Sequence, residues 1–301
     1  MTYWGETMLD ATERMDRRLL RSSGPLIATA SIAALLVVLA LFSLNKSHYT
    51  TKPLALGSSY PLYPRNAVLR VVSFNIHAGR DASGNDRIDD VARLLCDLQP
   101  DLVGLQEVRR NDPATRRVLQ DVVLSSKTNM VALYQPLVWM LGPTQGNAIL
   151  SRAYPQAERS MTMTGGSERR GILLISVKLG NTEVDFINVH LVLSRPERSE
   201  QIQAIVDLLT ERGNPAIIAG DFNARPDSEE LRPLAAICQE AWDIALIKHG
   251  DGNTFPTSDP RVRADQIWVY GPIEVLEVGV VETDVSDHLP VVASIRLRSL
   301  L

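Results

Sequence analysis

Pro215-Ala-Ile-Ile-Ala-Gly-Asp221-Phe222-Asn223 is the stretch that decides the fold class. Its apolar residues predict a buried β-strand, and Asp221 and Asn223 follow at the carboxyl end of that strand. Catalytic side chains gather at such strand ends in α/β proteins. Other apolar runs end in the same way, at Asn75, Glu107 and His190. Acids, amides and histidines therefore recur where strands end.

The rest of the chain continues this alternation of strands and helices. Strands are predicted at 68–75, 101–107, 147–151, 171–178, 183–190, 215–221, 265–270, 273–281 and 289–297, and helices at 87–98, 114–125, 196–212 and 228–238. The pair around Gly180-Asn181 predicts an antiparallel hairpin, which argues against a purely parallel sheet. We expect residues 67–301 to form an α/β domain, a four-layer sandwich of two packed mixed β-sheets flanked by helices.

Residues 25–44 form a twenty-residue run without a charged side chain, about the length that spans a bilayer. We interpret it as one transmembrane helix that precedes the domain. A cleaved signal peptide is the alternative, but the polar segment of residues 1–24 is long and no small-residue cleavage site follows. A buried soluble helix is a further alternative. Residues 45–66 are rich in proline, glycine and serine and predict a linker.

The charges differ on the two sides of this boundary. Residues 1–65 carry 7 Lys+Arg and 4 Asp+Glu, which leaves 24 and 31 for residues 66–301, a net charge of −7. Four arginines precede the apolar run, so the positive-inside rule predicts a cytoplasmic segment 1–24 and an extracytoplasmic catalytic domain in a single-pass membrane protein. The acidic domain disfavours tight nucleic-acid binding without excluding it. Both Cys96 and Cys238 lie in apolar helical contexts and are expected to be buried and unpaired.

Eight short motifs follow one another along the predicted domain. They are Phe74-Asn75-Ile76-His77, Leu105-Gln106-Glu107-Val108, Gly146-Asn147-Ala148-Ile149-Leu150-Ser151, Asn188-Val189-His190, Gly220-Asp221-Phe222-Asn223, Thr254-Phe255-Pro256, Arg263-Ala264-Asp265-Gln266-Ile267 and Ser286-Asp287-His288. Each is weak alone, but in this order the set resembles the endonuclease/exonuclease/phosphatase superfamily, the deoxyribonuclease I-like fold. The resemblance covers nearly all of residues 68–297.

The resemblance implies that Asn75, Glu107 and Asp287 surround a divalent cation beside the scissile phosphate. Oxygen ligands suit Mg²⁺ or Mn²⁺. Attack on a phosphate builds negative charge on its oxygens, and a cation offsets that charge.

The resemblance also implies that Asp221 and Asn223 orient the attacking water, with Asp221 as a proton acceptor. His190 and His288 would then act as acid, base or phosphate-stabilising groups, and Asp265 would orient His288. His77 is left open between phosphate contact and a structural hydrogen bond, and His249 is expected to be a loop residue.

Two further residues are expected to bind the substrate phosphate. Asn147 belongs to a matched motif, and the guanidinium of Arg170 suits a tetrahedral anion. One departure from the family pattern is Gln266, which stands where an aromatic residue is common after the aspartate, so the support of His288 is in question.

The function predicted from these features is a membrane-anchored, metal-dependent phosphoesterase that acts by water attack on a phosphodiester or phosphomonoester. The apolar run at residues 25–44 slightly favours a lipid head group or another envelope phosphoester as substrate. A nuclease acting on DNA is the alternative, and a non-catalytic protein that binds a phosphorylated ligand is a third hypothesis. No protein partner is indicated, and a monomer is expected.

Overall fold

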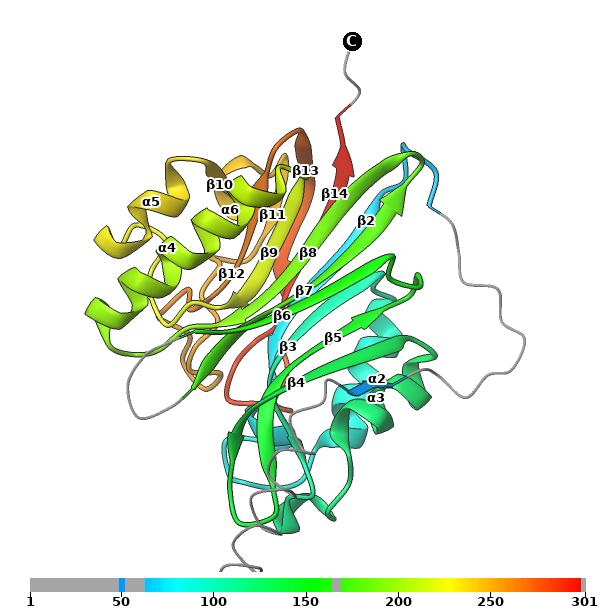
Figure 1. The fold of residues 1–301 in the computed structure, drawn as a ribbon. Helices are drawn as coiled ribbons and strands as arrows, with labels where there is room; N and C mark the ends of the chain where they lie inside the picture. Colours follow the sequence, from blue (N-terminus) through cyan, green and yellow to red (C-terminus); the bar gives the residue numbers. More distant parts are fainter. Residues whose placement is uncertain (1–48, 52–62, 164–168, 299–301) are drawn as a thin grey trace, which may run out of the picture. The chain divides into compact units, whose positions relative to one another are not determined.

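Two β-sheets pack face to face in the computed structural model, which describes residues 49–51, 63–163 and 169–298 (Figure 1). The first sheet runs in the order β1 (Tyr49–Thr51), β4 (Val131–Trp139), β5 (Thr144–Ser151), β3 (Leu102–Arg110), β2 (Leu69–Asn75), β14 (Val291–Leu297), β13 (Ile273–Val280) and β11 (Ile247–His249). The second runs in the order β10 (Cys238–Glu240), β12 (Asp265–Tyr270), β9 (Ala216–Asp221), β8 (Thr182–His190), β7 (Arg170–Leu179) and β6 (Ala157–Met163). Both sheets contain parallel and antiparallel pairs.

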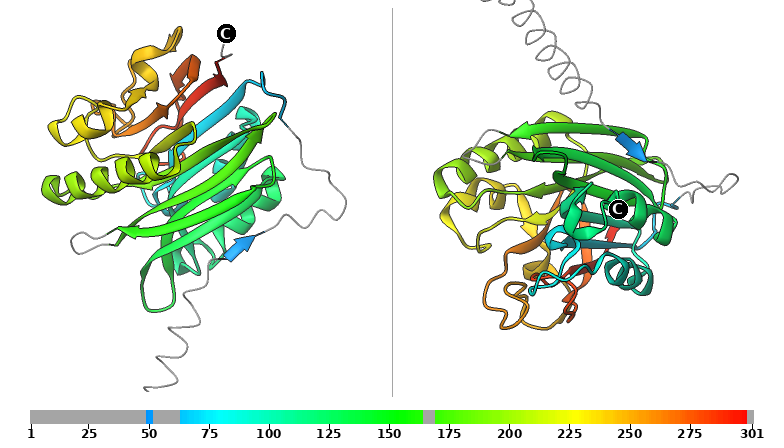
Figure 2. Two further views of the ribbon diagram at one scale, coloured as in Figure 1. Left: turned by 45° about the horizontal axis from the view of Figure 1, so that its top comes forward. Right: turned by 90° about the horizontal axis from the view of Figure 1, so that it is seen from below.

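Helices cover the outer face of each sheet (Figure 2). The helices are α2 (Ile88–Leu98), α3 (Gln120–Thr128), α4 (Arg195–Arg212), α5 (Arg232–Ala235) and α6 (Ala241–Ile244), with 3₁₀ turns η1 (His77–Gly79), η2 (Pro113–Thr115) and η3 (Glu229–Leu231). In Figure 1, α4 and α5 lie at the left and α2 and α3 at the lower right, with the strands between them.

Three apolar clusters hold these layers together. The first joins the inner faces of both sheets and includes Val71, Phe186 and Ile217, each 0% exposed. The second lies between the second sheet and α4, and the third lies between the first sheet and α2 with α3. Burying one such side chain contributes roughly 1.5–3 kcal/mol. The arrangement confirms the predicted α/β sandwich of two mixed sheets flanked by helices.

The ends of two predicted helices differ from the sequence-based expectation. Helix α3 begins at Gln120, not at 114, because Asp112 accepts a hydrogen bond from Ala114 N and starts a 3₁₀ turn instead. Arg116 and Arg117 then take positive φ values of 58° and 55°, which a helix does not allow. The predicted helix 228–238 is broken into η3, the single turn α5 and the start of β10.

The amino-terminal predictions are only partly within the described residues. The predicted span 25–44 and the segment 1–24 lie outside them, and no helix of the described part is long and apolar enough to cross a membrane. Within the predicted linker 45–66, residues Tyr49–Thr51 form β1 and pair with β4. Tyr63 also forms a bridge with Leu179.

The two cysteines differ from each other. Cys238 is buried as predicted, but Cys96 is exposed, so its predicted burial is wrong. The reason is the orientation of α2, which buries Ile88, Val91, Ala92 and Leu95 and leaves the next residue outside. Neither cysteine forms a disulfide.

Candidate active site

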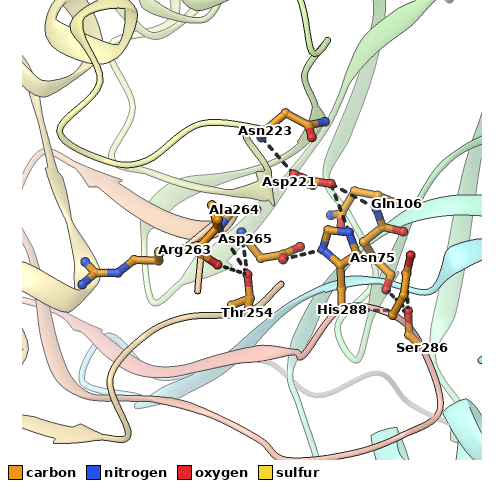
Figure 3. Close-up of polar contacts among 12 residues, drawn as sticks. Asn75, Gln106, Asp221, Asn223, Thr254, Arg263, Ala264, Asp265, Ser286 and His288 are labelled. Carbon is orange, nitrogen blue, oxygen red and sulfur yellow. Dashed lines mark hydrogen bonds and ion pairs between the residues drawn. The ribbon is translucent and has the colours of Figure 1, made fainter. Parts of the chain in front are cut away.

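Several predicted site residues lie where strands of the two facing sheets end. Asn75 is the last residue of β2, and His190 and Asp221 are the last residues of β8 and β9. Because β8 and β9 are parallel and pair in register at His190 and Asp221, these two residues lie side by side at the same end of the second sheet. Packing of the two sheets brings Asn75 to the same place. Figure 3 shows Asn75 and Asp221 side by side, with His288 and Asp265 next to them.

Asp221 is the centre of the hydrogen-bond network and is 1% exposed. Its Oδ2 accepts a hydrogen bond from Asn75 Nδ2 at 3.1 Å, and its Oδ1 accepts one from Asn223 N at 2.9 Å. The ring nitrogens His190 Nε2 and His288 Nε2 lie 3.5 Å and 3.9 Å from Asp221 Oδ2. One buried carboxylate therefore faces two histidines and an amide.

His190 is held as a neutral ring. Burial, with smaller contributions from the charges of Arg170 and His288, lowers the pKa of His190 to about 3 and outweighs the opposing effect of Asp221. Its Nδ1 lies 3.4 Å from Arg170 Nη1. Because a guanidinium can only donate, Nδ1 is the acceptor and Nε2 carries the proton. The N–H of His190 therefore points toward Asp221 and the mouth of the site.

His288 is in the opposite state. Its Nδ1 lies 2.7 Å from Asp265 Oδ2, and both residues are buried. Burial alone would lower the pKa of His288, but Asp265, Asp221 and Asp287 together raise it to about 10. His288 is thus a cation near neutral pH, with a proton on the nitrogen that faces Asp221. The two histidines provide one neutral donor and one charged donor to the same space.

The predicted His288–Asp265 contact is fixed by side chains for which the sequence suggested no role. Thr254 Oγ1 accepts hydrogen bonds from Ala264 N at 3.2 Å and Asp265 N at 3.1 Å. Ser286 Oγ donates to Asn75 O at 2.8 Å and accepts from His288 N at 3.3 Å. The ring of Phe255 packs on His288 with centroids 4.6 Å apart. These contacts fix the histidine in position and join it to the end of β2.

A second group of acids lies beside Asn75. Burial raises the pKa of Glu107, the neighbouring charges of Asp221 and Asp287 raise it further, and His77 and Asn75 oppose the rise. His77 Nδ1 lies 3.6 Å from Asp287 Oδ1, and His77 N donates to Asn75 Oδ1 at 3.0 Å. Glu107 stands at a register shift in β3 with a φ of 57°, which turns it out of the strand pairing. The structure thus brings Asn75, Glu107 and Asp287 into one neighbourhood.

These side chains fit a divalent cation. The charged form of the Glu107 carboxylate is costly without a counter-charge, because Asp221 and Asp287 lie near it. Oxygen ligands such as these suit Mg²⁺ or Mn²⁺. The ligand atoms of Asp221, Asp265 and His288 also lie within 4.8 Å of one another. We favour the set around Glu107, because Asp265 and His288 already use their facing atoms for each other. Asp265 Oδ1 is nevertheless buried without a hydrogen-bond partner in the described structure.

Asn223, Asn147 and Arg170, the remaining predicted site residues, make different contacts. The Asn223 side chain donates to Leu191 O at 2.9 Å, so it is its backbone N–H that contacts Asp221. Asn147 is buried and donates to Gly171 O at 3.0 Å, between the two sheets. Arg170 lies against His190. Of these three side chains, Arg170 therefore has the contact nearest to the catalytic cluster.

The unusual Gln266 does not disturb His288. Its Nε2 donates to Ala224 O at 2.6 Å and its Oε1 accepts from Trp268 Nε1 at 2.8 Å. Gln266 therefore fastens β12 to the loop after Asn223, while Asp265 retains its contact with His288.

His77 is the site residue that sequence reasoning left out. Its contacts with Asn75 and Asp287 place it beside the acids. The sequence signal for this position was its spacing of two residues after Asn75.

Asn188 is a second residue to which the sequence assigned no role. Its Nδ2 donates to Leu105 O and Ala148 O, both at 2.8 Å, and its Oδ1 accepts from Gln106 Nε2 at 2.7 Å. Asn188 thus ties β8 to the opposite sheet just below the site.

Solved structures share this fold. An endonuclease/exonuclease/phosphatase family protein from Bacteroides thetaiotaomicron has a TM-score of 0.66 at 18% identity over 78% of this chain and 99% of its own. A mannosyl-6-phosphatase from the same organism has a TM-score of 0.64 at 18% identity, covering 75% of this chain and 99% of its own. Truncated TDP2 from Caenorhabditis elegans has a TM-score of 0.60 at 21% identity, covering 76% and 98%. These identities show the fold alone.

A family model supplies the classification. No curated protein matches the chain in sequence. The model of the Endonuclease/Exonuclease/phosphatase family matches residues 72–288, which include the ends of β2, β3, β8 and β9 and the His288 segment. Members of this family are phosphoester hydrolases that use divalent metal ions. With its two-sheet sandwich and its cluster of acids and histidines at the strand ends, this chain belongs to the Endonuclease/Exonuclease/phosphatase family.

Proposed function

We propose that this protein is a membrane-anchored phosphoesterase in which Asp221 orients and deprotonates the water that attacks a phosphoester. The observation that carries the proposal is the arrangement around Asp221 Oδ2, which accepts from Asn75 and lies 3.5 Å and 3.9 Å from two histidine nitrogens in different protonation states. A carboxylate that is buried but held only by an amide, a backbone N–H and histidines can exchange a proton with a bound water.

Asn75, Glu107 and Asp287 would hold the divalent cation, with Mg²⁺ or Mn²⁺ as the ions that suit such oxygens. When bound, the cation would offset the charge that develops on the phosphate oxygens. His77 would orient Asp287 through their 3.6 Å contact.

The histidines have distinct roles in this proposal. His190, neutral and protonated at Nε2, donates a hydrogen bond to a phosphate oxygen, supported by Arg170 behind it. His288, cationic and held by Asp265, donates to a second phosphate oxygen or protonates the leaving group. The pair supplies fixed donors where negative charge grows.

The substrate class rests on charge and on the apolar run. The domain carries a net charge of −7 from 24 Lys+Arg and 31 Asp+Glu over residues 66–301, which disfavours broad tracking of a nucleic-acid backbone. Residues 25–44 would hold the domain at a membrane, on its extracytoplasmic side, and raise its effective concentration near lipid or envelope phosphoesters.

The test compares two matched variants of the full chain in detergent with Mg²⁺ or Mn²⁺. Asp221→Asn is expected to lower hydrolysis of bis(4-nitrophenyl) phosphate at least about a hundredfold, as loss of a general base does. Asp227→Asn makes the same chemical change on a side chain that is 80% exposed, six residues along the chain, and should retain full activity. Equal rates in the two variants would refute the role of Asp221.

Supercoiled plasmid is the second substrate in this assay. Nicking that Asp221→Asn abolishes and that weakens steeply with salt would make the protein a nuclease. Stoichiometric binding of a phosphorylated ligand, without turnover under any metal condition, would instead support a non-catalytic binding protein.

A further inference from the structure

The hairpin between β4 and β5 ends in an apolar tip. Leu141 is fully exposed at 108% and Met140 is 37% exposed, and both follow Trp139, the last residue of β4. A hydrogen bond from Met140 N to Pro143 O at 2.9 Å closes the turn, so the tip is a formed structure. Three consecutive large apolar residues at a protruding turn are unusual for a surface that faces only water.

This tip lies at the same end of the fold as the active site. Strands β3 and β4 both run antiparallel to β5, so β4 ends where β3 ends, beyond Glu107. In Figure 1 the β4–β5 hairpin extends to the bottom of the view. Strand β5 leads from the tip back to Asn147, five residues after Gly142.

A cation accompanies the apolar tip. The guanidinium of Arg169 lies 5.7 Å from the ring centroid of Trp139, and it belongs to the chain just before β7. The next residue, Arg170, contacts His190. Tryptophan and arginine together suit the interface of a bilayer, where the ring meets the hydrocarbon boundary and the cation meets anionic head groups.

The pairing of β1 relates this tip to the apolar run of the sequence. Tyr49 pairs with Tyr134, and Thr51 pairs with Ala132, in antiparallel register. The chain therefore enters the edge of the sheet from the side toward which β4 runs, the side of the hairpin tip. In the sequence, only residues 45–48 lie between the apolar run and β1.

From these observations we propose that Trp139, Met140 and Leu141, with Arg169, form a docking surface for a lipid bilayer, the same bilayer that would hold residues 25–44. Docking at this surface turns the mouth of the active site toward the membrane. The substrate is then a phosphoester displayed on that lipid surface. This part of the inference rests on the proposed function, whereas the docking itself does not require catalysis.

The first experiment measures contact of the hairpin tip with the bilayer and does not depend on enzyme activity. The full chain carries Cys96→Ser, which removes the exposed thiol, and Leu141→Cys labelled with the fluorophore NBD. The protein is reconstituted into vesicles of phosphatidylethanolamine and phosphatidylglycerol. We expect a blue-shifted emission and strong quenching by spin-labelled lipids.

The matched control is Leu246→Cys in the same background. Leu246 is 70% exposed and immediately precedes β11, at the opposite edge of the same sheet from β4. Its fluorophore should emit as in water and resist quenching. Equal emission and equal quenching at positions 141 and 246 would overturn the docking surface.

The second experiment measures how the hairpin tip affects the rates of hydrolysis of a phospholipid and of a soluble diester. Leu141→Asp in the reconstituted full chain should lower hydrolysis of phospholipid in these vesicles at least tenfold, with turnover of soluble bis(4-nitrophenyl) phosphate unchanged within twofold. Leu246→Asp should change neither. Equal loss on both substrates, or no loss on either, would overturn the link between the hairpin and the substrate.

The two hypotheses fail in different ways. A docked fluorophore in a protein that hydrolyses no phosphoester at all would refute the proposed function and leave the docking surface in place. A fluorophore in water, in a protein that hydrolyses the soluble diester at the normal rate, would refute the docking surface alone.

Discussion

Asp185 and Asp221 lie on the neighbouring strands β8 and β9, each 1% exposed, yet their surroundings differ completely. Asp185 accepts hydrogen bonds from Ser176 Oγ at 2.7 Å and from both Nε and Nη2 of Arg212, the latter at 2.9 Å. Asp221 faces an amide, a backbone N–H and two histidines. The first carboxylate is neutralised by a permanent cation, whereas the second faces two histidines, whose rings can gain or lose a proton.

The difference separates a structural acid from a chemical one. Arg212 cannot release a proton under ordinary conditions, so its pair with Asp185 is static and joins α4 to β8. The partners of Asp221 include no permanent cation, which supports its proposed role as the acceptor of a proton from water. Burial is the same in both cases, so burial alone does not identify a catalytic carboxylate, whereas the chemistry of its partners does.

We expect the largest change in hydrolysis rate when His288, a partner of Asp221, is replaced. His288→Ala removes the cationic donor, and the rate of phosphodiester hydrolysis by the folded variant should fall at least about a hundredfold. Its thermal midpoint should also fall, because buried Asp265 loses its ion-pair partner. His249→Ala is the control, because His249 is exposed and bonded only to Glu277 among the described residues. A rate for His288→Ala within twofold of that for His249→Ala would remove His288 from the mechanism.

Asp185→Asn should act on stability instead. It removes the buried carboxylate partner of Arg212 and leaves it the more exposed Glu183 at 3.2 Å. We expect a loss of about 2–3 kcal/mol in the free energy of unfolding, below the full value for a buried pair because the Arg212 side chain is 22% exposed and keeps this second partner. Urea unfolding measures it, with the turnover of the folded protein unchanged. Glu211→Gln breaks the exposed pair with Arg159 and should cost less than about 1 kcal/mol. If the folded Asp185→Asn variant lost turnover, Asp185 would not be a purely structural acid, and its contrast with Asp221 would be wrong.

Glu240 is a carboxylate in a third environment, and its effect on stability depends on pH. Burial, opposed by Arg263 and assisted by Asp243, raises the pKa of Glu240 to about 7. Between the model-peptide value of 4.5 and 7 the folded protein binds more protons at Glu240 than the unfolded chain does, so wild-type stability falls as pH rises through that window.

Glu240→Gln should remove this dependence. Relative to wild type, the variant should gain stability between pH 4.5 and 7, by up to about 3 kcal/mol for the full shift. Urea unfolding at pH 5 and at pH 7.5 measures the change. Parallel stability profiles for the two proteins would show that Arg263 compensates Glu240 fully.

Local sequence predicted most strands and failed where two signals conflicted. The apolar run before Asp221 became β9 within one residue of its predicted start. Strand β4 was missed because Pro136 interrupts it, and the structure accommodates this proline at a register shift between Pro136 and Val138. Helix α3 was predicted too early because its amphipathic pattern continues into the turn that Asp112 caps.

Hydrophobic alternation and chain order specify each strand and the residue that ends it, so the chemical groups at the strand ends could be predicted from the sequence. The sequence also determined the family, through the order of its motifs. The tertiary structure decided which groups meet. Asn75 reaches Asp221 across 146 residues, His288 reaches Asp265 across 23, and β1 pairs with the first half of β4. These contacts depend on how two sheets pack and which edges pair, and no local pattern encodes the packing of one sheet against another.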